Sequence, residues 1–280
     1  MFSLMDIAAK SLGHYVRKFF DSVRGYFAFM WELGKNCPST IHNFHTIVEQ
    51  MYVTGVTSIP VVFAASLATG AIMAWQLAYQ FGDMIPLVFV GMAVGKSVMV
   101  ELCPILTAMV LAGRVGASMC SELGTMAVTE QLDAYNVLGL NPYRFLLAPR
   151  LIASVVMLPI LTIISIFIGI VGGYATAFLY KEVSFSTFFY GVRMFYEDWD
   201  FAVGLIKAAL YGFFIASYAC FFGYNTHSGA EGVGKSTKAT VVAGMTSILV
   251  GGFVLSKLLL VCCLPKIIQK NAERIPKNIN

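Results

Sequence analysis

One stretch of the chain matches a phosphate-binding motif at every fixed position. Residues 229–236 read GAEGVGKS, which satisfies the pattern G-x-x-x-x-G-K-[ST] through Gly229, Gly234, Lys235 and Ser236. In a P-loop the glycines let backbone N–H groups surround phosphates, the lysine neutralises the β and γ phosphates, and the hydroxyl holds Mg²⁺. These roles require a strand before the loop and a helix after it. The flanking sequence therefore decides whether the motif indicates ATP hydrolysis.

The flanking sequence argues against a nucleotide site. Residues 201–222 are too long and too uniformly apolar for a core strand of about five or six residues. The helix expected from about Thr237 enters another apolar segment, and strands do not alternate with helices along the chain. We interpret GAEGVGKS as a cytoplasmic turn, with Lys235 and Lys238 on its cytoplasmic side and Ser236 or Thr237 capping the next helix. A membrane-anchored P-loop NTPase is the alternative.

Charged residues lie within apolar sequence. Lys96, Glu101 and Arg114 interrupt the apolar region 84–119, where an ionisable side chain costs about 2.5 to 3.5 kcal/mol. Glu101 and Arg114 are the two candidate site residues among them. Such a side chain should face a cavity, a partner charge or the membrane interface. Pro104 follows Glu101 closely, frees a backbone carbonyl and can bend the helix. A carboxylate at a bend suits the wall of a transport pathway; a structural ion pair and an interfacial position are the alternatives for both charges.

An acidic group follows on the same stretch. Glu122, Glu130 and Asp133 would fall within an arc of roughly 80° on a continuous helix. Such a face, on a short cytoplasmic helix at about 122–138, is either solvated or docked on a partner. The spacing leaves both interpretations open.

The candidate metal ligands are weaker. His42, His45 and Glu49 share one face of a plausible helix, and that spacing can bind zinc. The same residues also suit the water-facing end of a helix that enters a membrane, which is the interpretation we adopt. The six cysteines show no C-x-x-C spacing, so we expect neither disulfides nor a metal site.

Composition indicates a membrane protein. Of the 280 residues, 58% are hydrophobic and 12% are charged, and the mean hydropathy is +0.75, whereas a soluble domain carries about 25% charged residues. Five apolar segments are long enough to cross a bilayer, which takes about 20 residues. They lie at about 55–79, 84–119, 151–180, 201–222 and 240–264. We therefore expect an all-α integral membrane protein with five transmembrane helices, and the net charge of +4 forms no patch typical of nucleic-acid binding.

The regions outside the spans are expected to differ in character. Residues 1–48 combine apolar and aromatic side chains at helical spacing with an opposite basic face, which is typical of an amphipathic helix in the membrane interface. A soluble helix packed on another domain is the alternative. Residues 49–264 form the five-span domain, and 265–280 form a basic tail. Basic connections predict a cytoplasmic N-terminus, but an odd number of spans then places the basic tail outside.

The central block resembles a known family. The segment ELCPILTAMVLAGRVGASMCSELGTMAVTEQLDAYNVLGLNPYRFLLAPRLIA resembles the central signature of the MlaE/YrbE-type permeases, the membrane subunits of Mce-linked lipid-transporting ABC transporters. The likeness continues through WDFAVGLIKAALYGFFIASYACFFGY and GAEGVGKSTKATVV and covers about residues 12–260. It implies a homodimer in the bacterial inner membrane, with cytoplasmic ATPase subunits, an outer-side Mce-domain protein and in some systems a STAS-domain subunit.

The resemblance also implies roles for particular residues. Glu101 matches the acid of the family's E-L-G-P segment near the lipid cavity, although Cys103 replaces the glycine and Val100 stands where some members carry an arginine. The residues that match the cytoplasmic coupling helix, together with the neighbouring acid, are Glu122, Gly124, Glu130, Gln131 and Asp133. GAEGVGKST matches a cytoplasmic connection written G-x-x-G-V-G-x-A-T, in which the lysine position is variable.

The expected function is thus a permease subunit that moves phospholipid or a related lipid, performs no chemistry and uses no cofactor. An ion-coupled secondary transporter that uses Glu101 and Arg114 is one alternative. A membrane scaffold for the outer ring is another.

Overall fold

The computed structural model describes residues 23–37, 40, 44–81, 86–194, 196–227 and 229–274, with side chains up to residue 259. Every element in those ranges is helical. Five helical segments there are long and apolar enough to cross a membrane. They are Phe44–Gln80, Val88–Val128, Tyr143–Lys181, Asp198–Tyr224 and Gly229–Leu259. The all-α, five-span fold expected from the sequence is confirmed.

The first two spans are interrupted helices. The first consists of α2 (Phe44–Thr54), the 3-10 turn η1 (Val56–Ser58) and α3 (Ile59–Phe81). The second consists of α4 (Val88–Ser97), η2 (Val98–Leu102), α5 (Cys103–Leu111), η3 (Ala112–Gly116) and α6 (Ala117–Val128). Both η2 and η3 are π-helical turns, and such turns occur frequently at functional sites. The two π turns contain Glu101 and Arg114, two of the charges that the sequence places inside this span.

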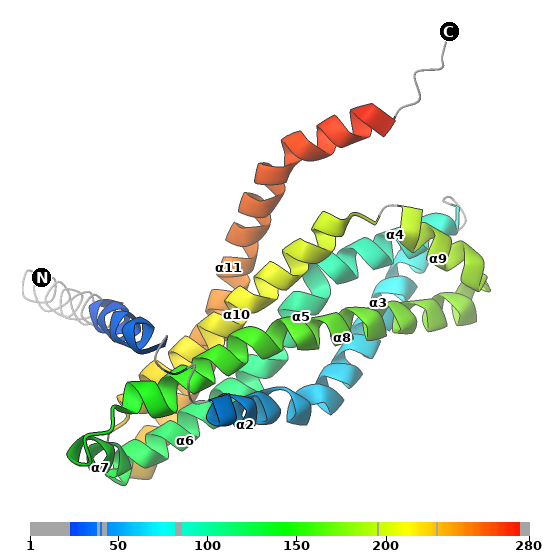
Figure 1. Ribbon diagram of the computed structural model, residues 1–280. Helices are drawn as coiled ribbons and strands as arrows, with labels where there is room; N and C mark the ends of the chain where they lie inside the picture. Colours follow the sequence, from blue (N-terminus) through cyan, green and yellow to red (C-terminus); the bar gives the residue numbers. More distant parts are fainter. Residues whose placement is uncertain are drawn as a thin grey trace, which may run out of the picture.

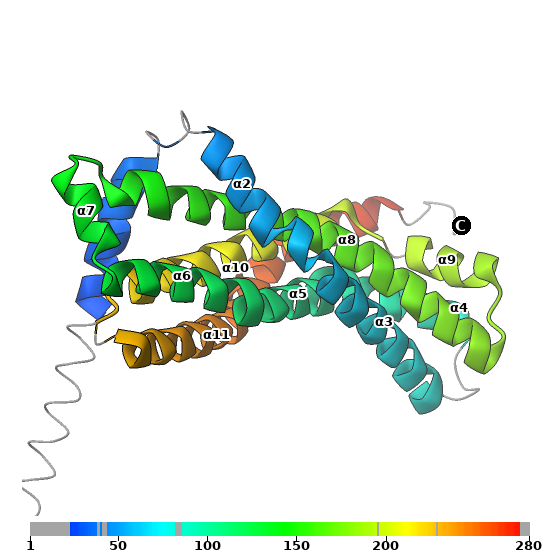
Figure 2. The ribbon, with the colours of Figure 1, turned by 90° about the horizontal axis from the view of Figure 1, so that it is seen from below.

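The other spans are more regular. The helices are α7 (Gln131–Val137), η4 (Tyr143–Leu147), α8 (Ala148–Lys181), α9 (Phe185–Met194), α10 (Asp198–Tyr224) and α11 (Gly229–Arg274). Figure 1 shows α7 at one end of the bundle and the pair α4 and α9 at the other. In Figure 2, α2 and α3 cross obliquely over α8, while α6, α10 and α11 lie side by side. A buried core contributed by α5, α6, α8, α10 and α11 joins these layers.

Glycines allow the spans to approach closely. A Cβ atom on Gly70 of α3 would lie 1.8 Å from the carbonyl oxygen of Gly169 on α8, and one on Gly91 would lie 2.3 Å from the carbonyl oxygen of Phe188. Small residues at such contacts let helix backbones pack without intervening side chains. The crossing of α3 and α8 therefore depends on Gly70.

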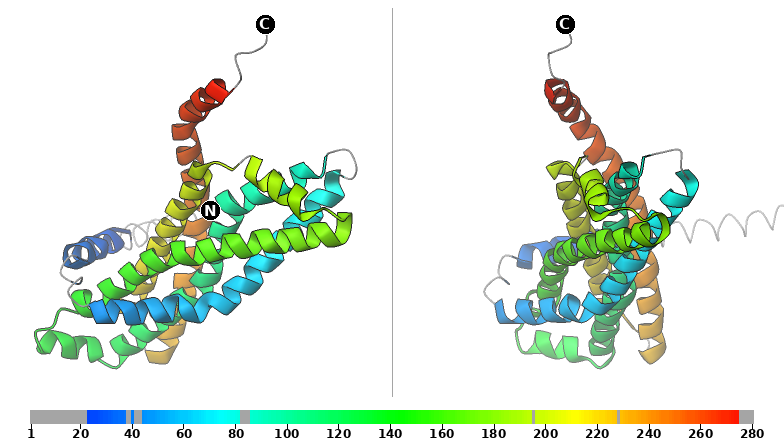
Figure 3. Two further views of the ribbon diagram at one scale, coloured as in Figure 1. Left: turned by 45° about the vertical axis from the view of Figure 1, so that its right-hand side comes forward. Right: turned by 90° about the vertical axis from the view of Figure 1, so that its right-hand side faces the viewer.

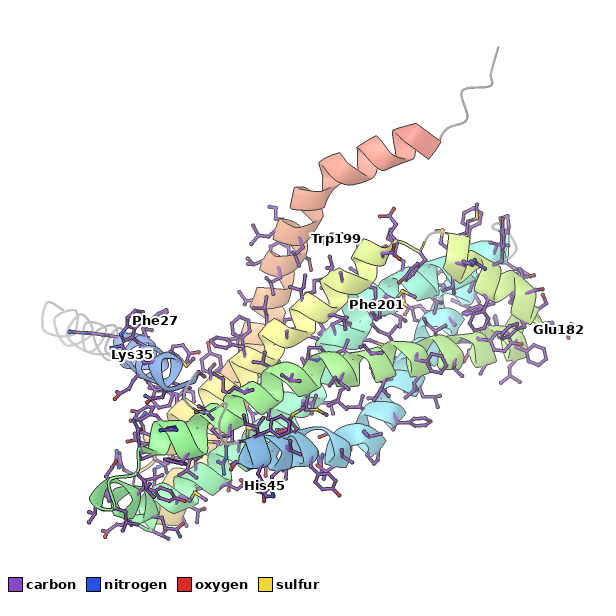
Figure 4. The ribbon with its side chains drawn as sticks, in the orientation of Figure 1. Phe27, Lys35, His45, Glu182, Trp199 and Phe201 are labelled. Atoms are coloured by element: carbon purple, nitrogen blue, oxygen red, sulfur yellow. The ribbon has the colours of Figure 1, made fainter. Side chains whose placement is uncertain are left out.

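The helix at residues 23–37 packs on the bundle through one face only. Phe29 and Leu33 are buried among side chains of α6, α8 and α10, and the Tyr26 hydroxyl donates a hydrogen bond of 2.7 Å to Ser217 Oγ. Burial raises the pKa of Tyr26 to about 12, although the hydrogen bond with Ser217 lowers it, so the phenol is neutral at physiological pH. Phe27, which is labelled in Figure 4, and Trp31 are about two-thirds exposed, as suits a helix in the membrane interface.

Two local predictions from the sequence are wrong. GAEGVGKS is not a turn before the last span, because α11 begins at Gly229 and includes the whole motif. Ser236 and Thr237 therefore do not cap the helix, and the Thr237 hydroxyl donates instead to the carbonyl of Val233 within it. The acidic residues do not share a continuous helix either, because α6 ends at Val128 and Glu130 adopts a left-handed conformation with φ of 58° before α7.

The last helix extends well past the bundle. α11 starts at the same end as α7, crosses beside α10 and α6, and continues to Arg274. Its C-terminal part projects away from the other helices, as Figures 1 and 3 show. The basic tail expected after residue 264 therefore begins on the side opposite α7.

Substitution of Gly70 tests the crossing of α3 and α8. Gly70→Ala should lower the free energy of unfolding by about 1–3 kcal/mol, the usual cost of overpacking, because its Cβ would meet a backbone carbonyl that cannot rotate away. Gly234→Ala is the matched control, because nothing lies within 4 Å of its Cβ and alanine favours a helix by about 0.5–1 kcal/mol. Thermal unfolding in one detergent would check both changes. Equal stability of the two variants would contradict the proposed contact.

Candidate functional site

A buried lysine organises the polar centre of the bundle. Lys207 of α10 is fully buried and lies against Glu101 of η2, where the ammonium group donates a hydrogen bond to Glu101 Oε2. The same group donates to the carbonyl oxygen of Val100 at 3.1 Å and to Ser256 Oγ at 2.9 Å. The three donors of the ammonium group are thus matched by three acceptors. We call Glu101, Lys207 and Ser256 the central polar cluster.

The local backbone explains why Glu101 reaches this position. The π turn at Val98–Leu102 widens the helix one turn before Pro104, whose missing N–H removes one helical hydrogen bond. Cys103 is buried and donates from Sγ to the carbonyl of Ser165 on α8. The second span is therefore held to α8 on one side and presents Glu101 to α10 and α11 on the other.

The central polar cluster is not completely enclosed. The Glu101 side chain is 37% exposed, whereas Lys207 is at 0%. The Tyr211 hydroxyl, one turn along α10, is buried without a hydrogen-bond partner among the described residues. An exposed carboxylate beside an unmatched buried hydroxyl can receive a polar group of a ligand.

Arg114 belongs to a different site. Its Nη1 donates to Ser58 Oγ of η1 at 2.6 Å, and the structure does not pair it with Glu101. Arg114 lines a groove of about 90 Å³ together with Gln50, Thr57, Ser118 and Glu122, and with the apolar side chains of Val53, Val115 and Met119. We call this the Arg114 groove.

The expected coupling residues divide into two groups. Glu122 is anchored, because its Oε2 accepts from Arg150 Nη2 at 3.1 Å and its Oε1 accepts from Ser118 at 3.0 Å. Gly124 is buried, and a Cβ there would lie 3.1 Å from Thr226 Oγ1. Neither residue is free to form the centre of a docking surface.

The exposed part of this region is its tip. Glu130, Gln131 and Asp133 are all exposed around the start of α7. Beyond them Val137 and Leu138 are 87% and 73% exposed. An acidic rim around exposed apolar side chains is the usual composition of a protein contact.

The P-loop look-alike has no phosphate-binding geometry. A P-loop needs consecutive backbone N–H groups that converge on an anion, whereas residues 230–236 form the first turns of α11 after Gly229, whose φ is 66°. Lys235 Nζ forms an exposed ion pair with Glu231 at 2.7 Å, one turn earlier on α11.

The structure does not bring metal ligands together in the described ranges, where no group of three His, Cys, Asp or Glu residues is close enough to hold an ion. His45 is exposed on α2, as Figure 4 shows. His42 lies outside the described residues, as do the side chains of Cys262 and Cys263.

Sequence reasoning missed two cations that matter. The patterns considered above give neither Lys207 nor Arg150 a role in a site. Arg150 is 4% exposed and pairs with Glu122. A search for opposite charges in different predicted spans would have suggested the pair of Glu101 and Lys207, because isolated charges in apolar helices need partners.

Comparison with known proteins gives a consistent result. The family described as Permease MlaE matches residues 47–258. A probable ABC transporter permease protein of Synechocystis is 37% identical over 217 residues, which are 78% of this chain and 82% of the relative. A probable ABC transporter permease protein of Rickettsia felis is 32% identical, with 91% and 98% covered. The intermembrane phospholipid transport system permease protein MlaE of Haemophilus influenzae is 32% identical, with 89% and 96% covered.

The unequal burial of Lys207 and Glu101 predicts unequal effects of their loss. Glu101→Gln should destabilise the protein by about 3–5 kcal/mol because it leaves a buried cation unpaired. Lys207→Met should cost less, because the remaining carboxylate is partly exposed. The double variant should recover part of the loss, which a double-mutant cycle of thermal unfolding would measure.

The exposed pair of Lys235 and Glu231 provides the control for this cycle. Its side chains are 77% and 79% exposed, so its coupling free energy should not exceed about 0.5 kcal/mol. Additive losses at Glu101 and Lys207 would show that the central pair is not coupled.

Proposed function

Because the chain belongs to the MlaE permease family, we propose that it forms the lipid pathway of an ATP-driven transporter whose ATP is hydrolysed by separate cytoplasmic subunits. The substrate is a phospholipid or a related lipid, which moves between the inner membrane and an outer-side Mce-domain protein. The chain acts as a homodimer, and a STAS-domain subunit is a further possible partner. The N-terminus and α7 lie on the cytoplasmic side.

The observation that carries this proposal is the central polar cluster inside an apolar bundle. A lipid pathway needs apolar walls for acyl chains and a small number of polar groups for the head group. Glu101 supplies an accessible carboxylate at the π turn before Pro104. Lys207 supplies a cation next to it, in place of the arginine that some members of the family carry at the position of Val100. A head group that enters here can exchange hydrogen bonds with the partly exposed Glu101 carboxylate and with Ser256.

The cytoplasmic end supplies a route for coupling. We assign contact with the ATPase to Glu130, Gln131 and Asp133 and to the exposed apolar tip of α7. Behind this tip, the ion pair of Glu122 with Arg150 joins α6 to the first turn of α8. A displacement of α7 is therefore passed to the second and third spans together. ATP binding can change the opening of the pathway only if it favours one of two conformational states of the bundle over the other.

The alternatives receive less support. The helical backbone of residues 230–236 does not suit a P-loop NTPase. An ion-coupled transporter that uses Glu101 and Arg114 would need them to act together, but Glu101 pairs with Lys207 and Arg114 with Ser58.

Removal of both central charges tests the lipid pathway. In proteoliposomes with the ATPase partner, Glu101→Gln/Lys207→Met should insert normally and lower ATP-driven phospholipid transfer by about tenfold, because the head group loses its polar contacts. The double change avoids an unpaired buried charge. Lys235→Met, which removes an exposed cation, is the control and should transfer lipid normally. Unchanged transfer by the double variant would refute the role of the central polar cluster.

Reversal of one surface charge tests coupling. Glu130→Lys should weaken binding of the ATPase subunit and reduce its lipid-stimulated hydrolysis by about fivefold, an effect of about 1 kcal/mol. Glu231→Lys, which reverses an exposed charge on α11, serves as the matched control. Pull-down of the ATPase and hydrolysis rates would measure both variants. If they behave alike, the coupling role of the α7 tip is wrong.

A further inference from the structure

The Arg114 groove and the central polar cluster are separate sites lined by different residues. The cation of the central polar cluster is matched by three protein acceptors, whereas Arg114 has the Ser58 hydroxyl as its acceptor. We propose that the Arg114 groove binds the head group of an amine-bearing phospholipid, such as a phosphatidylethanolamine, from the cytoplasmic leaflet. Arg114 contacts the phosphate in this site, and Glu122 contacts the ammonium group. The inference rests on the proposed function in one respect, which is the assignment of the groove to the cytoplasmic side of the membrane.

Helix lengths place the groove at the depth of lipid head groups. The second span has 41 residues between Val88 and Val128, about 60 Å at 1.5 Å per residue, whereas the hydrocarbon core is about 30 Å thick. About 20 residues counted from the outer end at Val88 cross that core and end near residue 108. Arg114 therefore lies beyond the hydrocarbon, on the side of α7.

The first span gives the same depth independently. It runs from Phe44 to Gln80, and about 20 residues counted back from Gln80 end near residue 60. Ser58, which accepts the hydrogen bond from Arg114, and Thr57 lie just past this point. Two spans counted from their own outer ends thus place the groove at the inner membrane interface.

Arg114 has charge and hydrogen-bond donors to spare. A guanidinium group carries five N–H donors, and within the described residues Arg114 uses one of them in its hydrogen bond to Ser58. Arg114 is exposed. No carboxylate within the described ranges forms an ion pair with it. A phosphate accepts two parallel hydrogen bonds from such a group and neutralises it. The hydroxyl of Thr57 and the amide of Gln50 line the same groove.

Glu122 supplies the second half of the recognition. Its side chain is 47% exposed even though it pairs with Arg150, so lone pairs on both oxygens can accept further bonds. Glu122 follows Arg114 by eight residues along the helix, which is about 12 Å nearer to the cytoplasm, and the two long side chains reach into one groove. In an inner-leaflet lipid the phosphate is also the deeper group and the amine the outer one. The order of charges in the groove therefore matches a zwitterionic head group.

The size of the groove indicates that only the head group enters. Its volume of about 90 Å³ is well below the roughly 300 Å³ of a site that encloses a whole ligand. The acyl chains would lie along the first span toward the membrane centre. Val61, which is 45% exposed there, provides an apolar surface for them.

Native mass spectrometry of the full chain tests this inference without the ATPase or a transport assay. The protein is taken from nanodiscs that contain equal amounts of phosphatidylethanolamine and phosphatidylglycerol, and retained lipids are counted. The wild-type chain should retain phosphatidylethanolamine over phosphatidylglycerol by about fivefold, as expected for one partly exposed charge contact. Arg114→Gln should lower retention of both lipids by about tenfold. The double variant Glu122→Gln/Arg150→Met, which avoids an unpaired buried cation, should keep the lipid but lose the preference for the amine.

Two further variants keep the test decisive. Lys235→Gln removes an exposed cytoplasmic-side cation outside the groove and should retain lipid as the wild type does. If Arg114→Gln does not fold, Arg114→Lys answers the question, because it keeps the charge but loses the bidentate geometry and should retain about threefold less lipid.

Three results would overturn the inference. The first is equal retention of both lipids by the wild-type chain, and the second is unchanged retention by the Arg114 variants. The third is dissociation of a dimer by Arg114→Gln with no change in bound lipid, which would show that a second copy of the chain covers the groove. Each of these results leaves the transport role of the central polar cluster standing, because that role is measured with other variants.

Discussion

The structure depends on one electrostatic constraint, the neutralisation of a lysine that is completely enclosed by apolar helices. Burial of an isolated ammonium group is strongly unfavourable, so Lys207 needs Glu101, the Val100 carbonyl and Ser256 around it. These acceptors come from η2 and α11, while the lysine comes from α10. The second, fourth and fifth spans must therefore meet at one point, and the π turn before Pro104 provides the local widening that brings Glu101 there.

The same constraint recurs toward the α7 end of the bundle with a different outcome. Arg150 is buried and neutralised by Glu122, which fixes α6 to α8 as one rigid unit behind the exposed tip of α7. Arg114 lies between the two ion pairs along the second span and has a hydroxyl for its partner instead of a carboxylate. The second span thus carries Glu101 paired with a buried lysine, Arg114 without a carboxylate partner and Glu122 paired with a buried arginine.

The sequence was sufficient for the architecture but not for the contacts. Apolar segments of membrane-spanning length predict the five helices directly, because a bilayer leaves few alternatives to a helix. The partner of Glu101 was not predictable from local pattern, since Lys207 is about a hundred residues away and pairing depends on how the spans cross. The break at Glu130 could not be predicted, because a left-handed backbone is usually indicated by glycine and here the residue is a glutamate. GAEGVGKS matches a phosphate-binding motif without forming such a site, because a pattern match specifies residue types and not backbone conformation.

The central claim is that this chain supplies a lipid pathway and that another polypeptide hydrolyses the ATP. The most direct measurement is purification of the tagged full chain from its native membrane, followed by identification of bound proteins and lipids by mass spectrometry and by an ATPase assay of the chain alone. The account predicts a co-purified ABC ATPase, bound phospholipid and no hydrolysis by the isolated chain. Hydrolysis by the isolated chain that Lys235→Ala abolishes, with neither an ATPase subunit nor lipid bound, would contradict it.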